Sequence, residues 1–142
     1  MRIALVDDAA VSRALFVRIA GELRHHVVVV PTAADDDGAS DVVAMAAAVR
    51  QSDPEIVVLD GRLADPRGTR LAAPTELIVA LDLFRGAVPH AIVGVVAAFG
   101  ETTLVRAATA AGAGFVVTRP YLRSQVGTTL SALVAARGSA SP

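Results

Sequence analysis

The chain is 142 residues long, and its composition excludes several classes of protein. Its 13 basic and 14 acidic side chains give a formal charge of −1, so no basic excess favours nucleic acid or an acidic membrane surface as a partner. The chain has no cysteine, which excludes disulfides, thiolate zinc sites and a cysteine nucleophile. Its longest apolar run, Ala91–Phe99, is nine residues long, about half of the roughly 20 that a membrane helix needs. We therefore expect one soluble, cytoplasmic globular domain.

Five short apolar runs rich in valine and isoleucine predict five strands buried on both faces. In chain order they are Ile3–Val6, Val27–Val30, Ile56–Leu59, Ala91–Val96 and Phe115–Val117. Apolar residues at helical spacing separate and follow these runs, over 11–23, 42–49, 77–84, 104–111 and 122–134. The alternation predicts a parallel α/β sheet, because a parallel connection needs a crossover long enough for a helix. Five such units predict an open, doubly wound sheet, since a closed eight-unit barrel needs roughly 250 residues.

Two segments have the composition of surface loops. Ala33–Asp41 is acidic and contains one glycine, and Gly61–Pro74 contains two prolines and two glycines. The last residues, Gly138–Pro142, are small and polar, which predicts a flexible tail. We therefore expect a domain at residues 1–137 and a tail at 138–142.

Charged residues gather at the expected carboxyl ends of the strands, where ligands bind in an open α/β sheet. Asp7 and Asp8 follow the first strand, Asp60 ends the third, and Arg119 follows the fifth. Carboxylates this close repel one another unless a cation lies between them, and Mg²⁺ is the natural partner for such oxygen ligands. A metal ion beside a free carboxylate is an arrangement that supports phosphoryl transfer to that carboxylate.

The chain resembles the receiver domains of response regulators in two-component signalling over about residues 2–137. The matching landmarks are Asp7-Asp8, Asp60 after Ile56–Leu59, Gly68 eight residues later, Ala107–Ala113 and Thr118–Tyr121. The resemblance implies a flavodoxin-like (βα)5 fold with strand order 2-1-3-4-5. It also implies a phosphoacceptor protein rather than an enzyme, with at most Mg²⁺-dependent self-phosphorylation and dephosphorylation.

The same resemblance implies a role for each site residue. Asp60 would accept the phosphoryl group, and Arg119 would stand at the position of the family's lysine. Asp8, Asp60 and the backbone carbonyl of Arg62 would bind Mg²⁺, with Asp7 acting through water.

Several positions depart from the family pattern, so we expect an atypical receiver. The family has threonine or serine 22 residues before its lysine, where this chain has Ala97. Its aromatic switch position, three residues before the lysine, is Val116 here, although Phe115 is adjacent. The Met-Pro that follows the phosphoacceptor in the family is replaced by Leu63-Ala64.

The expected partners are other proteins. A histidine kinase or phosphotransfer protein would supply the phosphoryl group. By resemblance, a downstream protein would bind the face made by helix four, strand five and helix five, roughly Glu101–Arg137. Arg106, Tyr121, Arg123 and Gln125 are expected to be exposed on this face, and arginine and tyrosine are frequent interface anchors.

Other interpretations remain open. The fold could serve as a phosphorylation-independent docking module, a pseudo-receiver, as Ala97, Val116 and Arg119 favour. Arg119 could pair with the acidic residues for purely structural reasons. A small Mg²⁺-dependent phosphatase is a third alternative, but a haloacid-dehalogenase phosphatase would need an aspartate where Arg62 stands.

Overall fold

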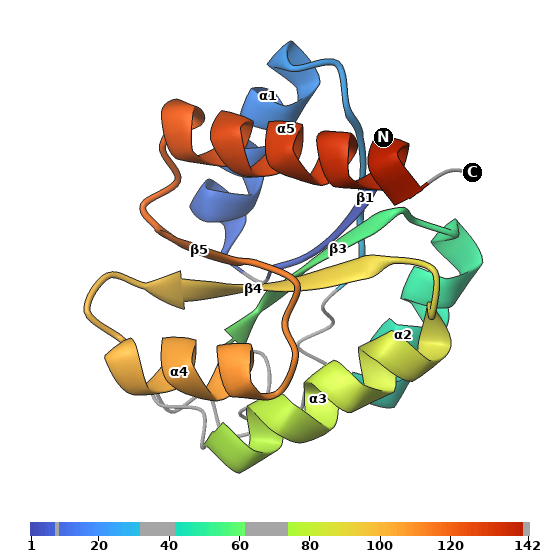
Figure 1. The fold of residues 1–142 in the computed structure, drawn as a ribbon, viewed down its shortest axis with the longest axis vertical. Helices are drawn as coiled ribbons and strands as arrows, with labels where there is room; N and C mark the ends of the chain where they lie inside the picture. Colours follow the sequence, from blue (N-terminus) through green and yellow to red (C-terminus); the bar gives the residue numbers. More distant parts are fainter. Residues whose placement is uncertain (8, 32–41, 62–73, 141–142) are drawn as a thin grey trace.

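The computed structural model describes residues 1–7, 9–31, 42–61 and 74–140, and strands and helices alternate along it (Figure 1). In chain order the elements are β1 (Arg2–Val6), α1 (Ala10–Glu22), β2 (His26–Val29), α2 (Val42–Ser52), β3 (Ile56–Asp60), α3 (Pro74–Ala87), β4 (Ile92–Ala98), α4 (Thr102–Ala110), β5 (Val116–Arg119) and α5 (Arg123–Ala140). The five strands form one parallel sheet in the order β2-β1-β3-β4-β5. This confirms the predicted doubly wound fold and strand order.

Helices cover both faces of the sheet, which explains why the central strands consist mainly of apolar residues. Figure 1 shows α1 and α5 on one face and α2, α3 and α4 on the other. One buried cluster accordingly joins alternate strand residues to Phe16, Val126 and Leu130 of α1 and α5. The other joins the remaining strand residues to Met45, Leu81 and further residues of α2, α3 and α4. Every residue of β3 is buried.

The strand register places the charged residues at one edge of the sheet. Val6, the last residue of β1, pairs with Leu59 of β3, so Asp7 and Asp60 follow at the same level. Asp60 pairs with Val96 of β4, and Ala98, two residues further along β4, pairs with Arg119 of β5. The carboxyl ends of β1, β3 and β5 therefore meet.

The structure describes most of the predicted C-terminal tail but hardly any of the two predicted loops. Helix α5 continues to Ala140, so three residues that the composition assigned to the tail are helical. Nothing in that stretch interrupts a helix, because the next proline is Pro142. The predicted loops Ala33–Asp41 and Gly61–Pro74 lie almost wholly outside the described residues. In the ranges that are described, none of the helices combines the length and apolar composition needed to cross a bilayer.

Candidate functional site

Asp7 is the most enclosed member of the site. Its side chain is fully buried at the end of β1. Oδ1 accepts hydrogen bonds from the backbone N–H of Ala9 at 2.9 Å and, in an ion pair, from Nη2 of Arg119 at 2.8 Å. Oδ2 accepts a hydrogen bond from the hydroxyl of Tyr121 at 3.2 Å. Three donors, one after β1 and two at the end of β5, therefore hold this carboxylate, as a buried charge requires.

Asp60 ends β3 beside Asp7, and its side chain is also buried. Its Oδ2 accepts a hydrogen bond from Nη2 of Arg119 at 2.8 Å. The next residue is Gly61, where a Cβ would lie 2.9 Å from Cδ2 of Leu104 and 3.2 Å from the carbonyl oxygen of Val96. A side chain at position 61 would displace Leu104 and crowd the backbone of β4, so glycine lets the chain run this close to β4 and α4 directly after the candidate phosphoacceptor.

Arg119 joins the two carboxylates through a single nitrogen. Its Nη2 lies 2.8 Å from both Oδ1 of Asp7 and Oδ2 of Asp60. Burial alone would lower the pKa of this guanidinium, but the adjacent charges of Asp60 and Asp7 outweigh burial and raise it. The arginine therefore stays charged. Its Nε is buried and has no hydrogen-bond partner among the described residues.

Tyr121 belongs to the site and not to an exposed interaction face, so the prediction from its sequence position is wrong. Only 4% of the residue is exposed. Its ring packs edge-to-face against Phe16 with the centroids 5.3 Å apart, while its hydroxyl donates to Asp7. The apolar body and polar tip of tyrosine fit this position between the helix core and a buried carboxylate. Burial, followed by the charge of Asp7, raises the pKa of the hydroxyl.

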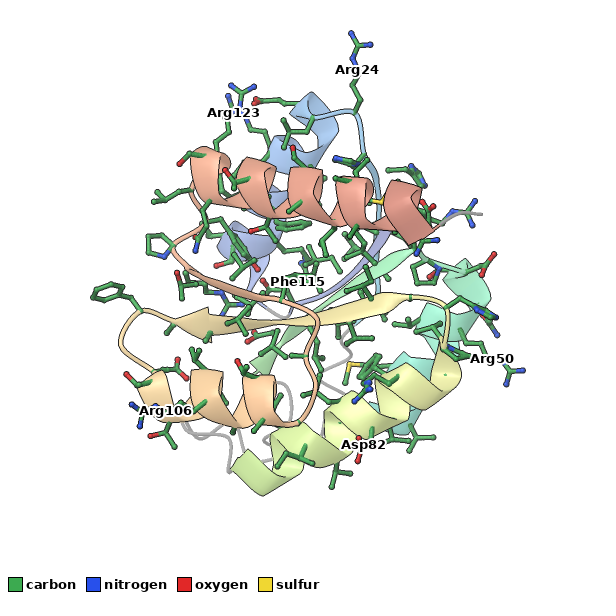
Figure 2. All side chains as sticks on the ribbon, viewed as in Figure 1. Arg24, Arg50, Asp82, Arg106, Phe115 and Arg123 are labelled. Atoms are coloured by element: carbon green, nitrogen blue, oxygen red, sulfur yellow. The ribbon has the colours of Figure 1, made fainter. Side chains whose placement is uncertain are left out.

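The other three residues predicted on that face differ in exposure. Arg106 of α4 and Arg123 at the start of α5 are exposed and extend outward (Figure 2). Gln125 is partly buried, and its Nε2 donates a hydrogen bond to Oγ1 of Thr118 at 3.2 Å. The two arginines thus remain accessible to a partner.

The two degenerate positions lie on the α2, α3 and α4 face of the sheet. Ala97 is buried and pairs with Thr118, and Val116 packs partly buried against the same cluster. Phe115 instead packs against the α1 and α5 cluster, where its ring fills the space over Gly94 (Figure 2). Neighbouring residues in extended chain point to opposite faces. Phe115 therefore cannot replace an aromatic side chain at position 116.

The predicted metal ligands are only partly described. Asp7 and Asp60 converge as expected, whereas Asp8 and Arg62 lie outside the described residues. The described part of the chain holds no group of three or more histidine or carboxylate side chains that could bind a metal. Carboxylate oxygens are the ligand type that Mg²⁺ prefers. Asp7 and Asp60 therefore have side chains of the right chemistry to bind such an ion. Arg119 supplies the positive charge between them.

Comparisons with known proteins agree with this architecture. No protein-family model and no curated protein matches the sequence. The crystal structure of the receiver domain of NtrX from Brucella abortus matches with a TM-score of 0.69 and 23% identity, over 94% of this chain and 98% of that domain. The signal receiver domain of a putative LuxO repressor protein from Vibrio parahaemolyticus matches with a TM-score of 0.69 and 16% identity, over 94% of this chain and 89% of that one.

Two further matches are a protein described as a putative pilus assembly protein and a longer NtrX chain. A putative pilus assembly protein, CpaE, from Burkholderia thailandensis matches with a TM-score of 0.69 and 19% identity, over 95% of this chain and 98% of that chain. The chain also covers 27% of a longer NtrX chain from Brucella abortus, so it spans about a quarter of that protein. The fold of this protein is therefore that of the receiver domains of response regulators.

Proposed function

We propose that this protein is an atypical receiver that accepts a phosphoryl group on Asp60 and signals through contact with another protein. The observation that carries the proposal is the ion-paired cluster at the sheet edge. There, Nη2 of Arg119 lies 2.8 Å from both Asp60 and Asp7. This arrangement places a carboxylate nucleophile beside a fixed positive charge, as transfer of an anionic group requires.

In the proposed reaction, a carboxylate oxygen of Asp60 attacks the phosphorus of the donor. The bond from phosphorus to the leaving group breaks, and the leaving group keeps the electron pair. A histidine kinase or phosphotransfer protein is the proposed donor, through the P–N bond of a phosphohistidine. Arg119 offsets the charge of the transferred oxygens, and Tyr121 keeps Asp7 oriented through its 3.2 Å hydrogen bond.

The proposal includes Mg²⁺ as the cofactor. Asp7, Asp8, Asp60 and the backbone carbonyl of Arg62 would hold it, with Asp7 acting through water. When bound, the ion would neutralise negative charge on the phosphoryl oxygens. The proposed output surface is the face of α4, β5 and α5, where Arg106 and Arg123 are exposed.

Intact-mass measurement after incubation with acetyl phosphate and Mg²⁺ tests the proposal. We expect the wild type to gain the mass of one phosphoryl group and Asp60→Asn to gain none. Asp82→Asn, an exposed position on α3, is the matched control and should behave as the wild type. An adduct that persists in Asp60→Asn would exclude Asp60 as the acceptor.

A second candidate function is a pseudo-receiver that docks on a partner without phosphorylation. The specific observation in its favour is that Arg119 already pairs with both carboxylates, in a site where Ala97 and Val116 replace the expected hydroxyl and aromatic side chains. The fold also occurs in a protein described as a pilus assembly protein. Absence of any wild-type adduct with acetyl phosphate or beryllofluoride would favour this function over the first.

A further inference from the structure

The Nε–H of Arg119 is buried and unpaired among the described residues. This buried donor has no acceptor among the described residues, although an unmet buried donor costs roughly 1–3 kcal/mol. The guanidinium around it is otherwise engaged in the site, because Nη2 holds Asp7 and Asp60. An acceptor is therefore expected at Nε when the site is occupied.

The geometry of arginine determines where that acceptor would lie. Nε–H and Nη2 share one edge of the planar guanidinium and present two nearly parallel donors. Nη2 on this edge faces the two carboxylates, so Nε–H is directed to the same side. Arginine binds the oxygens of phosphoryl groups through this kind of paired arrangement. A lysine ammonium has no second donor fixed in this way.

The residue at position 97 indicates a role for the unpaired Nε–H of Arg119. The resemblance to receivers implies a threonine or serine hydroxyl there, which would donate to a phosphoryl oxygen. Ala97 has no such hydroxyl, and the next residue of β4, Ala98, pairs with Arg119. The chain thus lacks one donor on β4 and has one extra donor on the adjacent strand β5.

We propose that Nε–H of Arg119 donates to a phosphoryl oxygen on Asp60 and so replaces the hydroxyl missing at position 97. This inference rests on the proposed function, since it concerns the phosphorylated form. Two donors on one edge of the guanidinium then have separate roles. Nη2 offsets the charge of the phosphoryl group, and Nε–H holds one of the phosphoryl oxygens. Losing one hydrogen bond to a charged oxygen corresponds to about a 10- to 100-fold change in affinity.

A double-mutant cycle with Arg119→Lys and Ala97→Ser tests this assignment. The measurement is the affinity for beryllofluoride in the presence of Mg²⁺, with melting temperatures to confirm folding. Arg119→Lys should lower the affinity about 10- to 100-fold, because an ammonium has no second donor held in the fixed geometry of the guanidinium edge. Ala97→Ser should restore most of that loss in the lysine background but change the wild-type affinity less than about threefold. Arg106→Lys, an exposed arginine on α4, is the matched control.

The outcomes separate the inference from the proposed function. If Ala97→Ser strengthens binding by the same factor in both backgrounds, the two donors are independent and the inference is wrong. If the wild type and all variants bind no beryllofluoride, the proposed function fails together with the inference. If Arg119→Lys does not fold, Ala97→Ser alone decides, because a gain of about tenfold or more in the wild type would show an oxygen without a donor.

Nuclear magnetic resonance gives a direct readout of the same hydrogen bond. The Nε–H signal of Arg119 should move and exchange more slowly with solvent when beryllofluoride binds. An adduct that forms while this signal stays unchanged would overturn the inference.

Discussion

At the scale of single residues, Asp7 and Asp60 are held by two side chains, Arg119 and Tyr121, whose removal would have different effects on stability. Arg119 contributes two 2.8 Å ion pairs, whereas Tyr121 contributes one neutral hydroxyl to Asp7. Removing the arginine would leave two buried carboxylates without their shared cation, a strongly destabilising change. Removing the tyrosine hydroxyl leaves both ion pairs in place. The Tyr121→Phe variant therefore measures what the hydrogen bond to Asp7 alone contributes to stability.

Tyr121 should make the stability of the protein depend on alkaline pH. The pKa of its hydroxyl is raised by burial and by Asp7, so above about pH 10 the folded state binds more protons than the unfolded state. Stability is therefore complete below about pH 10 and falls as the pH rises above that value. All 13 basic side chains are arginine and the chain has no cysteine, so Tyr121 is the only side chain with an ordinary pKa in this range.

Urea unfolding of the wild type and Tyr121→Phe between about pH 9 and pH 11 measures this effect. The wild-type unfolding midpoint should fall over this interval and that of Tyr121→Phe should stay nearly constant. At about pH 9 the variant should be less stable by roughly 1–3 kcal/mol, because Asp7 loses a hydrogen bond. Parallel pH curves for the two proteins would contradict the buried position of the hydroxyl.

Single residues also differ in how far their positions can be predicted from the sequence. The rule that ligands gather at strand ends located Asp7, Asp60 and Arg119, because each follows a clear apolar run. The same rule applied to Tyr121 would have placed it near the site, but a tyrosine is equally suited to an interface and to a buried position with a polar partner. Only the contact with Phe16 and the hydrogen bond to Asp7 distinguish the two.

At the scale of elements, β4 and β5 fit together through one glycine and one aromatic ring. A Cβ at Gly94 would overlap the ring of Phe115, so the middle of β4 has no room for a side chain on that face. Periodicity predicted both strands, but it carries no information on which aromatic ring lies over which glycine. Strand positions could be predicted to within about two residues because each strand contains a short apolar run. The packing of one strand's side chains against the next could not be predicted in this way.

Gly94→Ala should therefore destabilise the protein. Overpacking a filled core typically costs about 1–3 kcal/mol, and a domain of about this size loses roughly 2–4 °C in melting temperature per kcal/mol. Gly86→Ala is the matched control, because nothing lies within 4 Å of a Cβ there and alanine favours its helix α3. The control should be unchanged or slightly more stable. Equal melting temperatures for Gly94→Ala and the wild type would show that the ring is not fixed over the glycine.

At the scale of the whole molecule, carboxylates from separate strands meet at one edge of the sheet. Asp7 and Asp60 bring two buried carboxylates against the one guanidinium of Arg119, and Asp8 follows in the sequence. Because the chain contains no lysine, arginine at position 119 also agrees with the composition of the whole protein. A divalent cation that binds this edge would stabilise the folded state by mass action.

Mg²⁺ should accordingly raise the melting temperature of the wild type. At about ten times its Kd, an ion that binds only the folded state adds about 1.4 kcal/mol. Asp8→Ala should lose most of this response, and Asp82→Ala on α3 should keep it. An identical response in the wild type and Asp8→Ala would exclude a site that uses Asp8.

The edge-to-face pair of Tyr121 and Phe16 has a practical consequence for work on this protein. Tyr121 is the only tyrosine of the chain, which has no tryptophan, so ultraviolet emission excited through tyrosine comes from one side chain at one place. A carboxylate hydrogen-bonded to the phenol quenches such emission, and Asp7 accepts that hydrogen bond. Any ligand that draws Asp7 away from Tyr121 would therefore brighten the protein. The unlabelled wild-type chain thus carries its own optical probe of the candidate site.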